Sequence, residues 1–207
     1  MARCRAIACH LRFKVPEELP IDPLLSADEL SRGRALFKEA MGTRGTSGVT
    51  VLHPGVAGDP RTWPEGRFGA LGERLAREGR RVLFLTGPAE AASGEALKAA
   101  VPSAAHWVGQ SGLRNLCAVF RAVADGGGEL FVSDSGPAHI AAAVGLPVRL
   151  LAGPEDPERT GPWPPSGIER SPHRVVKAAA PEPPWTPRPM ESIHVDDALE
   201  ASDAGAT

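Results

Sequence analysis

Between residues 49 and 152, short apolar segments alternate with segments of helical periodicity. Each apolar segment is apolar at nearly every position, whereas a strand with one face in water would be apolar at every second position. Strands that are covered on both faces and separated by helices form the βαβ units of a parallel sheet. The pattern therefore predicts an α/β fold, a doubly wound parallel sheet of Rossmann-like type, with strands at residues 49–52, 81–86, 106–108, 129–133 and 147–152.

The first predicted helix has the clearest boundaries. Ser26 is followed three residues later by Glu29, which is the spacing of a capping box, and Gly42 marks the end of a helix over residues 27–41. Residues 154–189 are rich in proline and show little periodicity, so no regular element is predicted there. Further helices are expected over residues 68–78, 89–100, 113–123, 137–144 and 195–201.

The length of the chain bounds its domain organisation. A chain of 207 residues can bury the core of one α/β domain but is short for two complete nucleotide-binding domains. We expect a linker and helix over residues 1–48, left from the end of a preceding domain. One Rossmann-like domain is expected over residues 49–200, followed by a disordered tail over residues 201–207.

Charge and cysteine content exclude several classes of protein. A net charge of -2 without a basic stripe argues against a nucleic-acid-binding surface. The 3 cysteines have no C-x-x-C spacing, so neither a disulfide framework nor a zinc site is indicated, and we expect no metal and no cofactor. The sequence shows no transmembrane segment and no signal-peptide pattern, so we expect a cytoplasmic chain.

Loops that follow strands are the places to search for a site, because open parallel sheets bind ligands at the carboxyl ends of their strands. Residues 53–63 combine glycines, which allow a ligand to approach the backbone, with Arg61, which suits an oxyanion. Glu90 follows the strand at 81–86 and either accepts hydrogen bonds from ribose hydroxyls or only complements a helix dipole. Trp63 and Phe68 are expected to pack beneath the first loop.

The loop after residues 129–133 carries the stronger signal, because it leads directly into an alanine-rich helix. Ser135 can cap this helix, and Gly136 leaves the first amides open to a phosphate that the helix dipole favours without a metal. His139 lies in the first turn and can donate a hydrogen bond to the same phosphate. The alternative is that Asp134 and Ser135 only cap the helix and His139 belongs to the core.

Five motifs follow one another along the chain. They are His53-Pro-Gly with Arg61-Thr-Trp-Pro64, Leu83-Phe-Leu-Thr-Gly-Pro88, Gly109-Gln-Ser-Gly-Leu113, Val132-Ser-Asp-Ser-Gly-Pro-Ala-His139, and Gly153-Pro-Glu-Asp-Pro157 with Gly161-Pro162. In this order they resemble the motifs of glycosyltransferase family 9, which includes the heptosyltransferases. The resemblance covers residues 46–200, and the order of the motifs is more specific than any one of them. It implies a GT-B architecture, in which two Rossmann-like domains enclose the active site, and makes this chain the carboxy-terminal, donor-binding half.

The resemblance also implies an activity and a set of substrate-binding residues. The activity is metal-independent, inverting transfer from a nucleotide-diphosphate sugar such as ADP-heptose to a lipopolysaccharide or other glycan or glycolipid acceptor. Such an acceptor would be met at the inner face of the membrane. Arg61 takes the place of a lysine that contacts the donor phosphate, and Glu90 falls near an acidic residue associated with the nucleoside. The donor-binding loop is matched by Asp134, Ser135, Gly136 and His139.

The chain departs from the family pattern in two respects. We expect the amino-terminal acceptor domain, and the general base with it, to lie outside this chain, so the catalytic residues stay unassigned. Arg61 keeps the charge of the family's lysine but changes its geometry. Two alternatives remain open. One is a non-catalytic nucleotide-binding remnant or interaction module of a truncated or split gene, and the other is a sugar-nucleotide epimerase of GT-B type.

Overall fold

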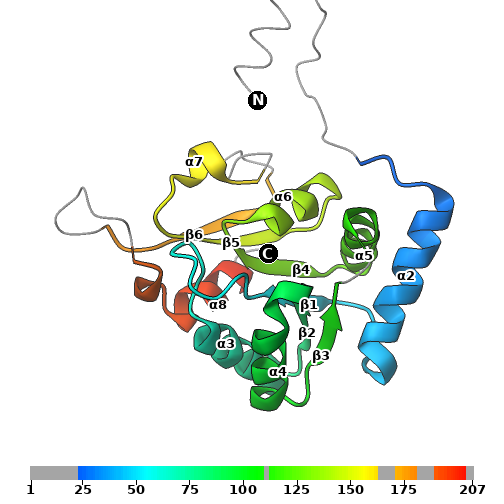
Figure 1. The fold of residues 1–207 in the computed structure, drawn as a ribbon, viewed down its shortest axis with the longest axis horizontal. Coiled ribbons are helices and arrows are strands. Elements are labelled where there is room, and N and C mark those ends of the chain that lie inside the picture. The colour runs from blue at the N-terminus through cyan, green and yellow to red at the C-terminus, as the bar shows by residue number, and fades with distance from the viewer. Residues whose placement is uncertain (1–22, 110–111, 163–170, 181–188, 204–207) are drawn as a thin grey trace, which may run out of the picture.

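The computed structural model describes residues 23–109, 112–162, 171–180 and 189–203 of the chain, which forms a parallel six-stranded sheet between two layers of helices (Figure 1). The strand order is β3-β2-β1-β4-β5-β6, and every pair of neighbours is parallel. This confirms the predicted doubly wound α/β fold. The strands are β1 (Val49–His53), β2 (Arg81–Thr86), β3 (Ala105–Val108), β4 (Glu129–Ser133), β5 (Val148–Ala152) and β6 (Arg174–Lys177).

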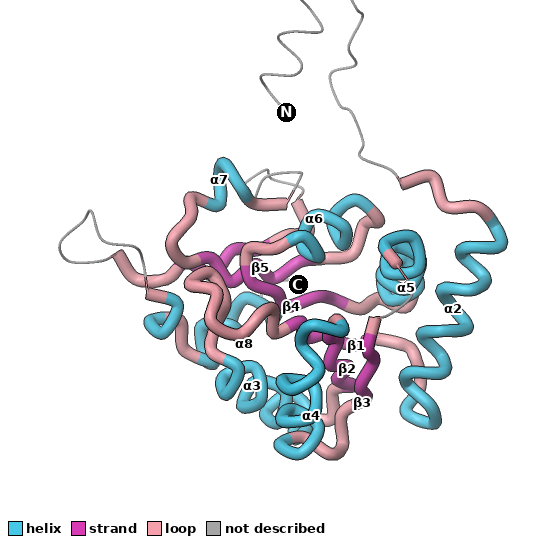
Figure 2. Tube along the Cα trace, viewed as in Figure 1, coloured by secondary structure: helices cyan, strands magenta, loops and turns pink. Residues whose placement is uncertain are grey.

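Helices cover both faces of the sheet, as the strand pattern requires (Figure 2). Successive residues of one strand enter different cores: Val51 of β1 packs with α2, α5 and α6, whereas Leu52 packs with α3, α4 and α8. Because β1, β2, β4 and β5 are buried on both sides, their sequences are apolar at most positions. The helices are α2 (Ala27–Met41), η1 (Gly42–Arg44), α3 (Glu65–Arg77), η2 (Pro88–Glu90), α4 (Ala91–Ala100), α5 (Leu113–Asp125), α6 (Gly136–Ala143), α7 (Pro157–Thr160), η3 (Met190–Ser192) and α8 (Val195–Asp203).

The first helix, α2, lies beside α5 at one edge of the molecule (Figure 1). The predicted capping box is confirmed, because the Ser26 hydroxyl accepts from the Glu29 amide and the Glu29 carboxylate accepts from the Ser26 amide. At the crossing, a Cβ on Gly33 would lie 2.4 Å from the carbonyl carbon of Ala118. Glycine therefore allows the two helix backbones to approach more closely than any other residue would.

The prediction for residues 154–189 is wrong, because this stretch contains α7 and β6. The strand β6 has only four residues, and its ends are exposed while its centre is half-buried. Such a segment has too few apolar positions to stand out among prolines. Several boundaries also differ: α3 begins three residues earlier than expected, directly after Pro64, and α5 and α8 each continue two residues further, to Asp125 and Asp203. Among the helices that the structure describes, none combines the length and apolar character needed to cross a bilayer.

Candidate functional site

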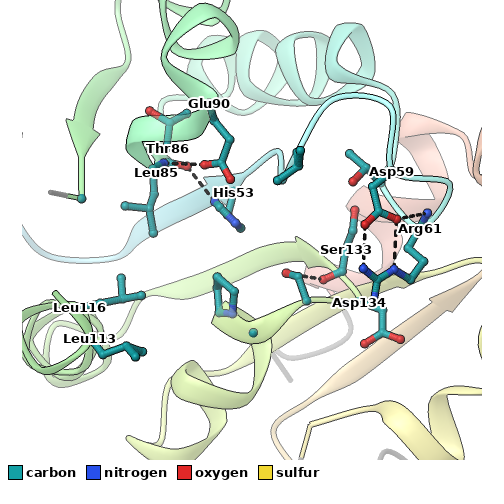
Figure 3. A pocket seen from close by; sticks show the side chains of 18 of the residues that line it. His53, Asp59, Arg61, Leu85, Thr86, Glu90, Leu113, Leu116, Ser133 and Asp134 are labelled. Atoms are coloured by element: carbon teal, nitrogen blue, oxygen red, sulfur yellow. Dashed lines mark hydrogen bonds and ion pairs between the residues drawn. The ribbon is translucent and has the colours of Figure 1, made fainter.

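A cavity of about 470 Å³ lies at the carboxyl ends of β1, β2, β3 and β4 (Figure 3). Its size is within the range of small-molecule sites. In the sheet, strands after β1 are added on one side up to β3 and then on the other side from β4, so the order reverses between β1 and β4. Open α/β sheets bind ligands at this reversal, where neighbouring loops turn away in opposite directions. The cavity is therefore where the topology predicts a site.

The polar end of the cavity is formed where β4 leads into α6. Ser135 occupies the N-cap position but makes no side-chain cap; its hydroxyl donates to the carbonyl oxygen of Ser133 at 3.1 Å. The expectation that Ser135 caps the helix is thus wrong. A Cβ on Gly136 would meet no atom within 4 Å, so the space in front of the first helical turn is open. An uncapped helix start that faces an open cavity is suited to bind an anion.

Asp134 connects this loop to α7 and does not cap α6. Its carboxylate accepts a hydrogen bond of 2.8 Å from the hydroxyl of Thr160. The loop is also fixed from below, because the backbone amide of Trp63 donates to the Ser133 hydroxyl at 3.0 Å. Both contacts join segments distant in sequence, so the loop is held in one position before any ligand arrives.

Arg61 reaches the polar end from the loop between β1 and α3, but it is already paired. Its guanidinium donates two hydrogen bonds to the Asp59 carboxylate, of 3.0 and 2.7 Å (Figure 3). These bonds, together with one from the Arg61 backbone amide, lower the pKa of Asp59 to about 2, and Asp59 in turn raises the pKa of Arg61. A ligand phosphate must therefore compete with Asp59 for Arg61.

The other predicted site residues take different positions. The Glu90 carboxylate lines the cavity and accepts a hydrogen bond from the amide of Gly87, so it caps the short helix η2 as well as facing the site. His139 is exposed and is not among the residues that line the cavity, so it does not belong to the core either. The residues that the structure brings together are Arg61, Glu90, Asp134, Ser135 and Gly136.

The opposite end of the cavity is apolar. Leu85, near the end of β2, lies there together with Leu113 and Leu116 from the first turn of α5 (Figure 3). Trp107 of β3 also lines the cavity. Sequence reasoning did not select these residues, because an apolar side chain near a strand end looks the same whether it packs in a core or lines a cavity. Gln110 and Ser111, from one of the family-like motifs, lie outside the described residues.

The loop between β1 and α3 is anchored by Trp63, as expected. Trp63 and Phe68 are fully buried and meet edge to face with ring centroids 5.0 Å apart. The indole nitrogen of Trp63 donates to the carbonyl oxygen of Ile193 at 2.9 Å. In the parts of the chain that the structure describes, no cluster of three or more His, Cys, Asp or Glu side chains could hold a metal ion.

Comparisons with known proteins agree on one family. The model for glycosyltransferase family 9 (heptosyltransferase) matches residues 3–177, a stretch that begins earlier than the motifs do. The lipooligosaccharide heptosyltransferase 2 of Haemophilus influenzae is 28% identical over 147 residues, which is 70% of this chain and 41% of that protein.

Solved structures give the same result for the fold. A glycosyltransferase family 9 protein from Veillonella parvula matches with a TM-score of 0.69 and 19% identity, covering 87% of this chain and 52% of that one. The ADP-heptose LPS heptosyltransferase II of E. coli matches with a TM-score of 0.69 and 20% identity, covering 92% of this chain and 55% of that one. The structure of E. coli heptosyltransferase WaaC with ADP matches with a TM-score of 0.69 and 18% identity, covering 97% of this chain and 54% of that one. These structural matches confirm the fold class. The chain spans about half the length of these GT-B relatives.

Proposed function

The chain belongs to glycosyltransferase family 9, and on this premise we propose that its cavity binds the nucleotide of a nucleoside-diphosphate sugar. In this proposal the chain is the donor half of an inverting, metal-independent glycosyltransferase. The donor is ADP-heptose or a similar sugar nucleotide, and the acceptor is a lipopolysaccharide or another glycan. The acceptor site and the general base belong to a second, acceptor-binding domain, and the reaction takes place in the cytoplasm at the membrane surface.

One observation carries the proposal, namely that the two ends of the cavity differ in chemistry. The uncapped start of α6 at Gly136 offers backbone amides to an anion, while Trp107 and Leu113 offer an apolar surface to a flat, weakly polar group. A nucleoside diphosphate has this division, with a base at one end and a diphosphate at the other. The volume of the cavity, about 470 Å³, also suits a ligand of this size.

The charged groups of the cavity assign roles in the transfer step. As the acceptor oxygen attacks the anomeric carbon, the bond to the diphosphate breaks and negative charge grows on the leaving nucleotide. In this proposal the amides at Gly136 stabilise that charge, joined by Arg61 once it leaves Asp59 and by the exposed His139 from outside the cavity lining. The lining side chains include three carboxylates, Asp59, Glu90 and Asp134, against this single guanidinium. The attraction of the amides and Arg61 for the diphosphate must therefore exceed the repulsion from these carboxylates, and we expect a second domain to add positive charge.

Calorimetric titration with ADP, UDP and GDP, first without metal and then with magnesium, tests the proposal. We expect binding without metal and a preference for one base, because the diphosphate site consists of amides and a guanidinium. Absence of binding to every nucleotide would overturn the proposal and favour a module that does not bind nucleotides.

A double variant, Asp134→Ala with His139→Ala, separates this site from nucleotide binding elsewhere on the chain. We expect it to lower the affinity for ADP at least fivefold, since loss of the Asp134 to Thr160 hydrogen bond frees the loop that presents the amides, and this loss exceeds the gain from removing the repulsive carboxylate of Asp134. The single variant His139→Ala should have a smaller effect, because His139 is exposed outside the cavity lining. Unchanged affinity in the double variant would favour the non-catalytic alternative.

A further inference from the structure

His53, the last residue of β1, lines the cavity but has no role in the transfer step proposed above. Its side chain lines the cavity, although the residue as a whole is only 7% exposed. The ring nitrogen Nδ1 lies 3.0 Å from the carbonyl oxygen of Leu85 on the neighbouring strand (Figure 3). This contact continues the pairing of β1 with β2 by one further rung, so the imidazole is held in a fixed orientation.

The hydrogen bond to Leu85 determines which ring nitrogen carries the proton. A carbonyl oxygen can only accept, so Nδ1 must donate, and in the neutral ring Nε2 is then an acceptor. Within the described residues, the buried side-chain nitrogen or oxygen left without a partner is Nε2 of His106. Among the described residues, Nε2 of His53 has no hydrogen-bond partner and is not such a buried atom, so it faces the cavity that His53 lines. It is an acceptor prepared for a ligand donor.

The strand order indicates which part of a nucleotide this acceptor meets. The apolar end of the cavity lies at the ends of β2 and β3, the anion-binding end lies at the end of β4, and β1 stands between β2 and β4. A nucleoside diphosphate that spans the cavity from base to diphosphate therefore places its ribose over the end of β1. The ribose hydroxyls are the hydrogen-bond donors of that region.

We infer that His53 is a specificity-determining residue whose Nε2 accepts a hydrogen bond from a ribose hydroxyl of the bound nucleotide. This inference rests on the proposed function, because it assumes a nucleotide in the cavity. The contact would make the site select ribonucleotides, since a buried acceptor left unpaired by a deoxynucleotide weakens binding.

Two variants of His53 separate the two ring nitrogens. Asn places an amide N–H where Nδ1 lies, so His53→Asn keeps the bond to Leu85 and loses the acceptor. Gln places its amide oxygen near the position of Nε2, so His53→Gln keeps the acceptor. Titrated with ADP, His53→Asn should bind about fivefold more weakly than the parent chain and His53→Gln within about twofold. Thermal unfolding of both variants identifies any loss that comes from misfolding.

Deoxynucleotides test the same contact without depending on a variant's stability. The parent chain should bind either 2′-deoxy-ADP or 3′-deoxy-ADP about fivefold more weakly than ADP, and His53→Asn should not distinguish that analogue from ADP. If the parent chain binds ADP and both analogues equally, the inference about His53 fails while the proposed function stands. If the parent chain does not bind ADP, UDP or GDP, the proposed function fails and the inference with it.

Discussion

The two ends of β4 both hold charged and polar groups beside a cavity, yet they differ in how those groups are paired. At the amino end, Glu129 accepts from Arg80, from Arg149 at 2.8 Å and from the Ser202 hydroxyl at 2.7 Å. A cavity of about 410 Å³ opens there as well. At the carboxyl end, the start of α6 is uncapped, and Nε2 of His53 has no partner among the residues that the structure describes. A cavity alone therefore does not mark a ligand site; hydrogen-bonding capacity left open within it does.

The amino end also gains rigidity from the chain that surrounds it. Arg149 donates a second hydrogen bond to the carbonyl oxygen of Pro172, and the next residue, His173, accepts from the amide of Val148 through Nδ1 at 3.1 Å. Ser202 belongs to the last helix, so Glu129 joins α8 to the centre of the sheet. The groups at this end stabilise the fold because they satisfy one another.

The largest expected change in stability comes from removing the negative charge of Glu129 at the amino end of β4. Glu129→Gln keeps the shape of the side chain but leaves Arg149, with only 7% of its side chain exposed, without a counterion. Breaking one partner of a buried ion pair costs about 3–5 kcal/mol, so the free energy of unfolding should fall by roughly that amount in a urea titration.

The control for Glu129→Gln is Glu73→Gln, which removes a carboxylate from an exposed pair with Arg77 on α3. Its effect should stay below about 0.5 kcal/mol, because solvent screens this pair. Equal effects of the two variants would refute the distinction between a closed stabilising network and surface charge. In the folded fraction of either variant, ADP affinity should not change, because both residues lie at a distance from the proposed nucleotide site.

The next effect is a dependence of stability on pH at the same end. Burial, with the positive charge of Arg149, lowers the pKa of His173 to about 4 from an ordinary value of 6.5. The unfolded chain therefore binds a proton between about pH 6.5 and pH 4 that the folded chain does not. Stability is fully present above that window and falls by up to about 3 kcal/mol as the pH drops through it.

The variant His173→Asn tests this assignment, since the Asn carbonyl oxygen can still accept from the amide of Val148. Unfolding free energies measured across the same pH range should decline less steeply for the variant than for the parent chain. A slope that the substitution leaves unchanged would mean that other groups cause the acid sensitivity.

The contrast between the two ends also explains what the sequence could predict. The strands at 81–86 and 129–133 were found with their boundaries because burial on both faces leaves a continuous apolar run. The loop from Asp134 to Gly136 was selected because it follows a strand and leads directly into a helix, and it lines the cavity. The Ser135 cap was wrong because its hydroxyl is turned toward the carbonyl oxygen of Ser133, to which it donates, and makes no bond to the amides of the helix; only the folded loop fixes that orientation.

Residues whose role depends on distant partners could not be predicted. His53 is orientated by Leu85, which is 32 positions away, and Glu129 is paired with arginines 49 and 20 positions away. A sequence pattern of period 2 or 3.6 does not report such pairs, because they arise from strand order rather than from local conformation. The network at the amino end of β4 could therefore not be predicted from the sequence, and the site at the carboxyl end could be predicted only from its loops.

The smallest expected effect concerns the ion pair between Arg61 and Asp59 at the carboxyl end of the sheet. If Asp59 competes with the diphosphate for Arg61, Asp59→Asn should raise the affinity for ADP about threefold, the range expected for release of an exposed ion pair. Glu155→Gln is the matched control, because Glu155 acts on Arg61 through its charge alone. Removing it should raise the affinity less, so the difference between the two variants measures the competition itself. Weaker binding by Asp59→Asn would reverse the interpretation. Asp59 would then orientate Arg61 toward the diphosphate, and the carboxyl end, like the amino end, would be held by its own pairs before the ligand binds.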